Sequence, residues 1–201
     1  MNLYNDDDTG DQGRFFGVMV GIVTDNQDPE KLGRVRVRFP WLSDDDASHW
    51  ARIAVGMAGN GRGLFLLPEV DDEVLVAFEH GRPESAYVLG ALWNGKDRPP
   101  SDNGDGKNNL RMLRSRAGHE VVLDDTAGAE QVIVRDGGGK SSVVIDMANG
   151  RVTVTADKEL VLACTGKLTI GGDGAKIAIK GAELKVSCDK VDVNNGALEV
   201  T

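Results

Sequence analysis

The chain has 201 residues, a formal net charge of −9 and 26 glycines, but aromatic residues make up only 5% of it. This length allows one large domain or two modest ones, and many glycines with few aromatics indicate tight turns around thin cores. The acidic charge opposes nucleic-acid binding, and no apolar run approaches the roughly 18 residues of a transmembrane helix. The polar start MNLYNDDDTGDQGR is unlike a secretory signal, so we expect synthesis in the cytoplasm.

The first half of the chain predicts irregular β structure. In GRVRVRF, from Gly33 to Phe39, the apolar residues alternate with arginines, as in a strand with one buried face. No segment carries a sustained helical period, and short strands separated by Gly, Pro and Asp suit a small closed barrel. The strands that we expect are Phe16–Thr24, Gly33–Phe39, Trp50–Val55, Gly63–Leu67, Glu73–Phe78 and Tyr87–Trp93.

A polar stretch, NGKDRPPSDNGDGKNN, separates this half from the rest and is typical of a linker. The charge also divides there, because residues 1–109 hold 19 acids and 11 bases whereas residues 110–201 hold 13 and 12. We therefore predict an acidic N-terminal segment (1–13), a barrel (14–97), a linker (98–109) and a second domain (110–201).

The second half is a repeat of short apolar clusters. They begin at Val121, Val132, Val143, Val152, Leu160, Leu168, Ile177, Leu184, Val191 and Leu198, so the steps shorten from eleven residues to seven. Each late cluster is an apolar pair around one polar or small residue, and this alternation predicts a buried and a wet face. Glycines such as Gly166, Gly181 and Gly196 fall between clusters, where the chain must turn.

Two arrangements would bury these pairs. In an antiparallel meander, a short strand with a tight turn also spans about seven residues, but the gaps carry no consistent Asn-Gly or Asp-Gly hairpin signal. In the other, three copies wind together, and each step covers about a third of a turn around a shared axis. We favour the second arrangement. Its predicted axial core contains Ile177, Ile179, Leu184, Val186, Val191 and Val193.

The two cysteines, Cys164 and Cys188, share the alternation phase of the apolar pairs. We expect both to be small, reduced core residues, since the sequence supplies no further partners for a metal site.

The stretch GRGLFLLPEVDDEVLVAFEHGRPESAYVLGALWNGKDRPP resembles the oligonucleotide/oligosaccharide-binding (OB) barrel of contractile-injection spikes. This family includes phage baseplate assembly protein V, the VgrG spikes of type VI secretion and pyocin spikes. GVMVGIVTDNQDPEKLGRVRVRFPWL is similar to the first strands of the same domain, so the resemblance covers residues 14–100. Asp71 stands where the family usually has glycine, but Asp tolerates a left-handed turn. The resemblance implies an all-β chain, with an N-terminal OB-fold barrel followed by a C-terminal triple-stranded, intertwined homotrimeric β-helix.

The same resemblance implies a non-enzymatic spike that punctures a target envelope when a tail sheath contracts. We expect it to enter the baseplate of a phage tail-like particle, with a separate hub protein on its N-terminal side. Exposed apolar pairs at the end of a trimer would be unfavourable in water. A PAAR-like tip protein is therefore expected to cover Leu198, Val200 and Thr201, and no cofactor or metal is expected.

Two other functions were weighed. An enzyme would need carboxylates that face each other across a cleft, whereas Asp44–Asp46 and Asp71–Glu73 are adjacent and typical of solvated turns. His49, His80 and His119 lack the spacing of a metal site, and GNGRG lacks the Lys-Ser/Thr of a P-loop. The alternative to a spike is an OB binding module for polysaccharide or single-stranded nucleic acid, with a basic stripe at Arg34, Arg36 and Arg38.

Overall fold

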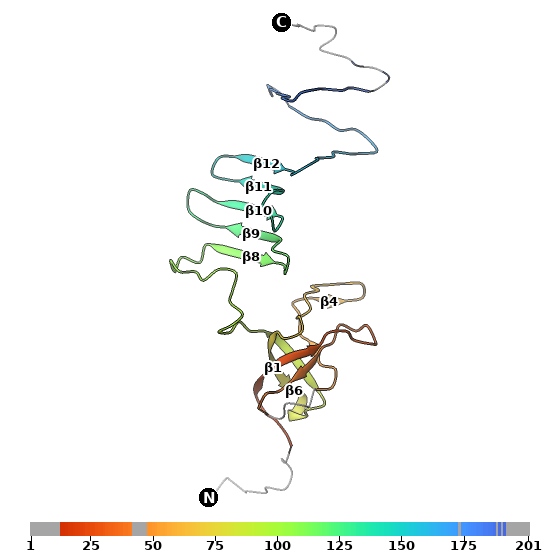
Figure 1. Ribbon diagram of the computed structural model, residues 1–201, viewed down its shortest axis with the longest axis vertical. Helices are drawn as coiled ribbons and strands as arrows, with labels where there is room; N and C mark the ends of the chain where they lie inside the picture. The colour runs from red at the N-terminus through yellow and green to blue at the C-terminus, as the bar shows by residue number, and fades with distance from the viewer. Residues whose placement is uncertain (1–12, 42–47, 173, 188, 190, 192–201) are drawn as a thin grey trace, which may run out of the picture.

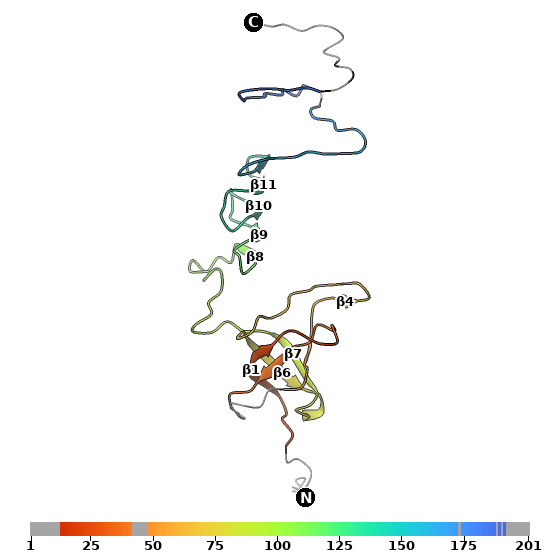
Figure 2. The ribbon, with the colours of Figure 1, turned by 45° about the vertical axis from the view of Figure 1, so that its right-hand side comes forward.

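The computed structural model describes residues 13–41, 48–172, 174–187, 189 and 191, and these residues are all-β apart from one 3₁₀ turn. Three parts follow one another along the molecule: a barrel-like domain, a stack of five strands and an extended segment (Figure 1). Figure 2 shows the same order after a turn of 45°. In the part of the chain that is described, no helix has the length and apolarity needed to cross a membrane.

The first domain is a five-stranded sheet in the order β2-β1-β6-β7-β3. Its strands are β1 (Val18–Asp25), β2 (Arg36–Arg38), β3 (Arg52–Ile53), β6 (Glu73–Phe78) and β7 (Ala86–Ala91), and the 3₁₀ turn η1 (Glu79–Gly81) follows β6. Neighbours are antiparallel except β3 and β7. The N–H of Val35 donates to the Ala51 carbonyl (3.0 Å) and that of Ala51 to the Val35 carbonyl (2.7 Å). This bridge joins the segments before the two edge strands, so the sheet curls toward closure.

The alternation in GRVRVRF places its apolar side chains in the core, as predicted. Val35 and Val37 are fully buried and Phe39 is 4% exposed. Gly21 on β1 permits close packing there, because a Cβ atom at this position would lie 2.2 Å from Cγ1 of Val37. The remaining buried core residues are Val23, Ala51, Val74, Val76, Phe78, Ala86 and Val88.

The predicted strand Gly63–Leu67 is wrong. A short hairpin of β4 (Ala58–Gly59) and β5 (Arg62–Gly63) precedes this stretch, and residues 64–67 form no strand. LFLL has no apolar–polar alternation, so neither side of a strand would face water. The GNGRG stretch, residues 59–63, lies in this hairpin. Asp71 has φ = 76°, which confirms the left-handed turn before β6.

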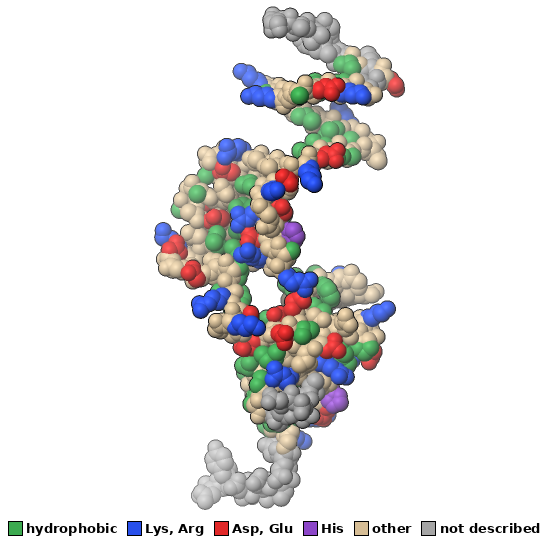
Figure 3. All heavy atoms as spheres, in the orientation of Figure 1, with side chains coloured by type: hydrophobic (Ala, Val, Ile, Leu, Met, Phe, Trp, Pro, Cys, Tyr) green, Lys and Arg blue, Asp and Glu red, His purple; other side chains and the backbone are tan. Residues whose placement is uncertain are grey.

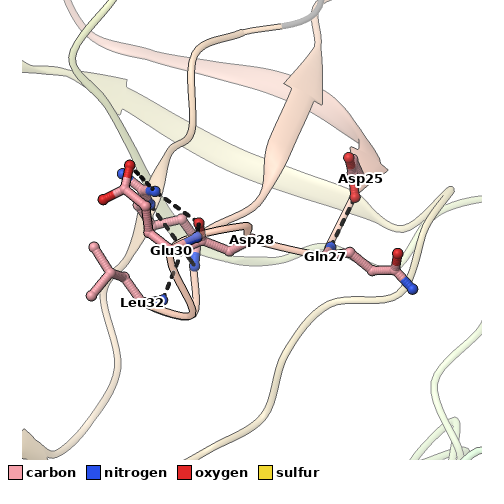
Figure 4. A network of polar contacts seen from close by, with 6 residues as sticks. Asp25, Gln27, Asp28, Glu30 and Leu32 are labelled. Atoms are coloured by element: carbon pink, nitrogen blue, oxygen red, sulfur yellow. Dashed lines mark hydrogen bonds and ion pairs between the residues drawn. The ribbon is translucent and has the colours of Figure 1, made fainter.

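One carboxylate organises the loop between β1 and β2 (Figure 4). Asp28 Oδ1 accepts hydrogen bonds from the Glu30 N–H (3.0 Å) and from Arg34 Nη2 (2.7 Å). Its Oδ2 accepts from the Leu32 N–H (3.0 Å) and from Arg34 Nε (2.9 Å). These bonds, that from Arg34 above all, hold the pKa of Asp28 well below its usual range. The loop is thus fixed by a single ionised side chain.

The second sheet is an antiparallel meander in the order β12-β11-β10-β9-β8. Its strands are β8 (Leu110–Arg114), β9 (Glu120–Asp124), β10 (Gln131–Arg135), β11 (Ser142–Asp146) and β12 (Arg151–Thr155), each of five residues. The four-to-six-residue turns between them give the chain room to reverse direction, as hairpins require. Residues 110–155 of the single chain therefore form the antiparallel meander, which was the less favoured of the two arrangements that the sequence allows.

The extended segment, defined as residues 156–191, forms no strand in its described residues. The apolar clusters recur here every seven to nine residues, against nine to eleven in the sheet. A five-residue strand within a seven-residue step leaves only two residues to reverse the chain, and such turns need Gly or Asn at particular positions. The shorter step therefore favours pairing with other chains over pairing within one.

We predict that Asp28→Asn destabilises the first domain. A carboxylate whose pKa is lowered by folding stabilises the fold above its unfolded pKa, about 3.9, and this stabilisation is lost as the pH falls. The urea midpoint of the wild type should therefore fall once the pH goes below about 4. Asp28→Asn should have a lower urea midpoint at pH 7, and that midpoint should change less as the pH falls. Glu30→Gln is the control, because Glu30 lies 3.1 Å from Arg34 but is 67% exposed. Equal midpoints for both variants would contradict this role of Asp28.

Candidate trimer interface

The register of the second sheet places both members of each apolar pair on one face. Val121 lies opposite Val134, which lies opposite Val143, which lies opposite Val154. A parallel row joins the other members of the pairs, Leu123, Val132, Ile145 and Val152. Directly opposed residues share a face, so these eight form one surface, called the apolar face. Leu113 extends the first row and was not among the predicted pairs, because Arg111 occupies the matching position on β8.

The apolar face is open to water in the single chain. Its members apart from Val132 are exposed, from 41% at Val143 to 65% at Val152. Seven exposed apolar side chains on one face of a sheet indicate an interaction site, since soluble monomers seldom expose large contiguous apolar patches.

The opposite face of the sheet carries charges that are paired within the chain. Glu120 is 8% exposed and accepts a hydrogen bond from Arg135 Nε (2.6 Å), and Arg114 Nε lies 3.4 Å from its other oxygen. Asp146 accepts from the Asn149 N–H (3.0 Å) and pairs with Arg151 (3.2 Å). The charged groups of this face are therefore satisfied within the chain.

Asp146 also fixes the turn between β11 and β12. The side-chain amide of Asn149 donates to both of its oxygens, at 3.1 and 2.9 Å. These bonds, together with the Asn149 N–H and the nearby Arg151 charge, lower the pKa of Asp146. The carboxylate is thus kept ionised on the charged face of the sheet.

The apolar pairs continue along the extended segment, where every one of them is exposed. Exposure ranges from 53% to 68% for Leu160, Leu162, Leu168, Ile170, Ile177, Ile179, Leu184, Val186 and Val191. Figure 3 shows hydrophobic side chains at the surface of this part. Cys164 is also exposed, so the single chain does not bury it as predicted. Val193, the predicted tip residues Leu198, Val200 and Thr201, and Cys188 lie outside the described residues.

The backbone of the extended segment has the same need of a partner. Backbone N–H and C=O groups are nearly always paired when they leave water, yet no strand ladder is present in the described residues after Thr155. The accessible surface of the whole chain is 16576 Å², whereas a compact monomer of this mass exposes about 9,200 Å². A single chain therefore leaves unburied much of the surface that folding normally removes.

Asp72, Glu73 and His119 have local structural roles. Asp72 accepts the Glu69 N–H (2.8 Å), and Glu73 accepts from the Asn94 amide (3.3 Å). Nδ1 of His119 accepts the N–H of Gly137 (3.1 Å). Within the described residues, no group of three or more His, Cys, Asp or Glu side chains is arranged to hold a metal. Asp44–Asp46 lie outside that part of the chain.

The arginines of the basic stripe of the barrel interact with other residues of the same chain. Arg34 is held by Asp28, and the Arg36 guanidinium lies 5.1 Å from the centre of the Trp50 ring, a distance typical of cation–π contact. Arg38 also has an interaction partner. These contacts engage the stripe that a nucleic-acid or polysaccharide module would present to its ligand.

Two family models match the chain in succession. Residues 19–93 match the type VI secretion system/phage-baseplate injector OB domain, and residues 111–199 match the phage baseplate V C-terminal trimerisation domain. The first match covers the curled sheet, and the second covers the meander and the extended segment. A trimerisation domain implies a homotrimer, which agrees with the unpartnered apolar face.

Curated relatives carry the same assignment. The chain is 35% identical over 133 residues to the type VI secretion system spike protein VgrG4b of Pseudomonas aeruginosa, which covers 54% of this chain and 16% of the relative. It is 31% identical over 130 residues to the spike protein VgrG3 of Vibrio cholerae, covering 58% and 13%. The actin cross-linking toxin VgrG1 of Vibrio cholerae is 27% identical over 129 residues, covering 60% and 12%. The chain thus spans less than a fifth of the length of each.

The predicted family and the all-β fold class are both confirmed by these matches. The order of the two matched domains is also the order of the two sheets in the structure. The chain belongs to the phage baseplate V and type VI secretion spike family, with an injector OB domain followed by a trimerisation domain.

Proposed function

We propose that three copies of the chain form the central spike of a contractile tail or injection particle and puncture the target envelope when the sheath contracts. The observation that carries this proposal is the run of apolar pairs from Val121 to Val191. Those in the sheet lie on one face, and the single chain leaves the run largely exposed. Three copies around one axis would bury every pair.

In this trimer each chain supplies one side of a three-sided prism through its second sheet. The apolar face points inward, and the face with Glu120 and Asp146 meets water. Beyond Thr155 the three extended segments wind around one another, so that each chain receives ladder hydrogen bonds from the other two. The predicted axial residues Ile177, Ile179, Leu184, Val186 and Val191 lie in this segment, and Val193 continues their pattern in the sequence.

The role of this spike is mechanical and needs no catalytic residue. Sheath contraction supplies the work, and the trimer supplies stiffness because no sheet edge stays open along it. The hub protein would bind at the OB end. The PAAR-like tip protein would cover the Leu198 and Val200 pair, and the envelope would be contacted only in passing. The family descriptions "injector" and "trimerisation", and the word "spike" in two relatives' names, support this assignment.

We predict a particle mass of about 64.5 kDa in solution, three times the 21.5 kDa of one chain. Analytical ultracentrifugation or native mass spectrometry measures this directly. Contractile particles purified from the native host should also contain three copies each, counted by quantitative mass spectrometry. A monomer, or particles without the chain, would contradict the spike.

We predict that Val154→Asp weakens or abolishes the trimer, whereas Thr153→Asp does not. Both residues are exposed on β12 in the single chain, but they point to opposite faces. In the prism Val154→Asp places three carboxylates near one axis, where burying each charge is costly. Sedimentation of both variants measures the difference. Equal behaviour would show that the apolar face is not the inward face.

We predict that Ile179→Ala lowers trimer stability by about 2–5 kcal/mol per chain, through the cavity that it leaves in a packed core. Because the residue occurs three times, the loss per assembly should be roughly threefold larger. Thermal unfolding at fixed protein concentration measures it, with Ala178→Gly at the neighbouring outward position as the control. An unchanged midpoint for Ile179→Ala would remove this residue from the axis.

A further inference from the structure

The OB domain also exposes an apolar surface that its own core does not use. We call it the hairpin patch: Met57, Leu64, Phe65 and Leu66, which lie just before β4 and just after β5. Their exposed fractions are 51%, 51%, 78% and 52%. They line a groove of about 710 Å³ beside the barrel, whose wall also includes Leu32. Four large apolar side chains gathered at one place are typical of a protein contact.

The hairpin itself is weakly held within one chain. It has two residue pairs, Ala58 with Gly63 and Gly59 with Arg62. A two-stranded hairpin is at best marginally stable in water unless something packs against it. A covering surface would therefore order the hairpin as well as bury the hairpin patch.

The hairpin patch lies at the end of the OB domain that faces the second sheet. In both ribbon views β4 projects to one side of the barrel, at the end of the barrel that is nearer to β8 (Figures 1 and 2). Glu69, three residues after Leu66, forms an ion pair with Arg116 in the turn between β8 and β9 (2.9 Å). This exposed pair contributes little affinity, but it brings the loop after the hairpin patch close to the turn between β8 and β9.

We propose that the hairpin patch packs against the adjacent copy of this chain, so that the trimer has a second contact at the level of the barrels. The proposal rests on the trimer of the proposed function. Trimerisation holds three OB domains around one axis at the end of the shaft, which gives their patches a high effective concentration for one another. The trimerisation domain brings identical copies together, and the Glu69–Arg116 ion pair ties the loop after the hairpin patch to that domain, so the neighbouring copy is the occupant.

The test measures whether the patch is covered in the full-length trimer. Phe65→Cys and, separately, the exposed variant Glu84→Cys, which lies outside the groove of the hairpin patch, are treated with a maleimide, and modification at each cysteine is read by peptide mass spectrometry. Each rate is divided by the rate of the same variant in urea, which removes differences in thiol reactivity. Phe65→Cys should react about tenfold or more slowly than Glu84→Cys, since a covered thiol reacts only after local opening.

Leu64→Cys provides a second position in case Phe65→Cys disturbs the loop. A trimeric mass with equally fast labelling at Phe65→Cys, Leu64→Cys and Glu84→Cys would overturn the barrel-level contact and leave the spike intact. A monomeric mass would instead overturn the spike proposal itself. Slow labelling at both patch positions in a trimer, with fast labelling at Glu84→Cys, supports the contact.

Discussion

An extended chain with no neighbour can hydrogen-bond its backbone only to water, and the described part of the segment after Thr155 is in that position. Its N–H and C=O groups lack a ladder, and its apolar pairs lack cover, in the part of the chain that is described. Both needs are met by the same event, the arrival of identical neighbours that supply hydrogen bonds along the edge and apolar side chains toward the centre. The trimerisation domain that the chain matches implies such neighbours.

The spacing between apolar pairs decides where a chain pairs with itself and where it needs others. Steps of nine to eleven residues leave turns long enough for β8–β12 to fold back as a meander. Most steps in the extended segment are of seven or eight residues, which leave corners too short for most hairpins. The pairs are nevertheless the same in both regions, so one apolar strip runs through a locally folded part and a part that other chains must complete. The paired charges at Glu120 and Asp146 lie on the opposite side of the first part.

Much of this could be predicted from the sequence, because alternation reports which side chains share a face. Val35, Val37 and Phe39 are buried as their spacing indicates, and the pairs Val121–Leu123 and Val143–Ile145 lie together on one face. Alternation is silent on pairing partners, so it could not separate a meander from winding chains over residues 110–155. It also failed at Gly63–Leu67, where a continuous apolar run was taken for a strand although its side chains have no common buried face. That run proved to hold the hairpin patch.

The five strands of the meander are consecutive, and their contacts are therefore local in sequence. Local contacts form quickly, whereas pairing between separate molecules must wait for encounters that depend on concentration. We expect each newly made chain to acquire its OB domain and meander first, and to present the open apolar face as a template on which two others align. Pairing between the three chains would then proceed from β12 toward the C-terminus. The register of the three chains would therefore be set before the extended segments pair.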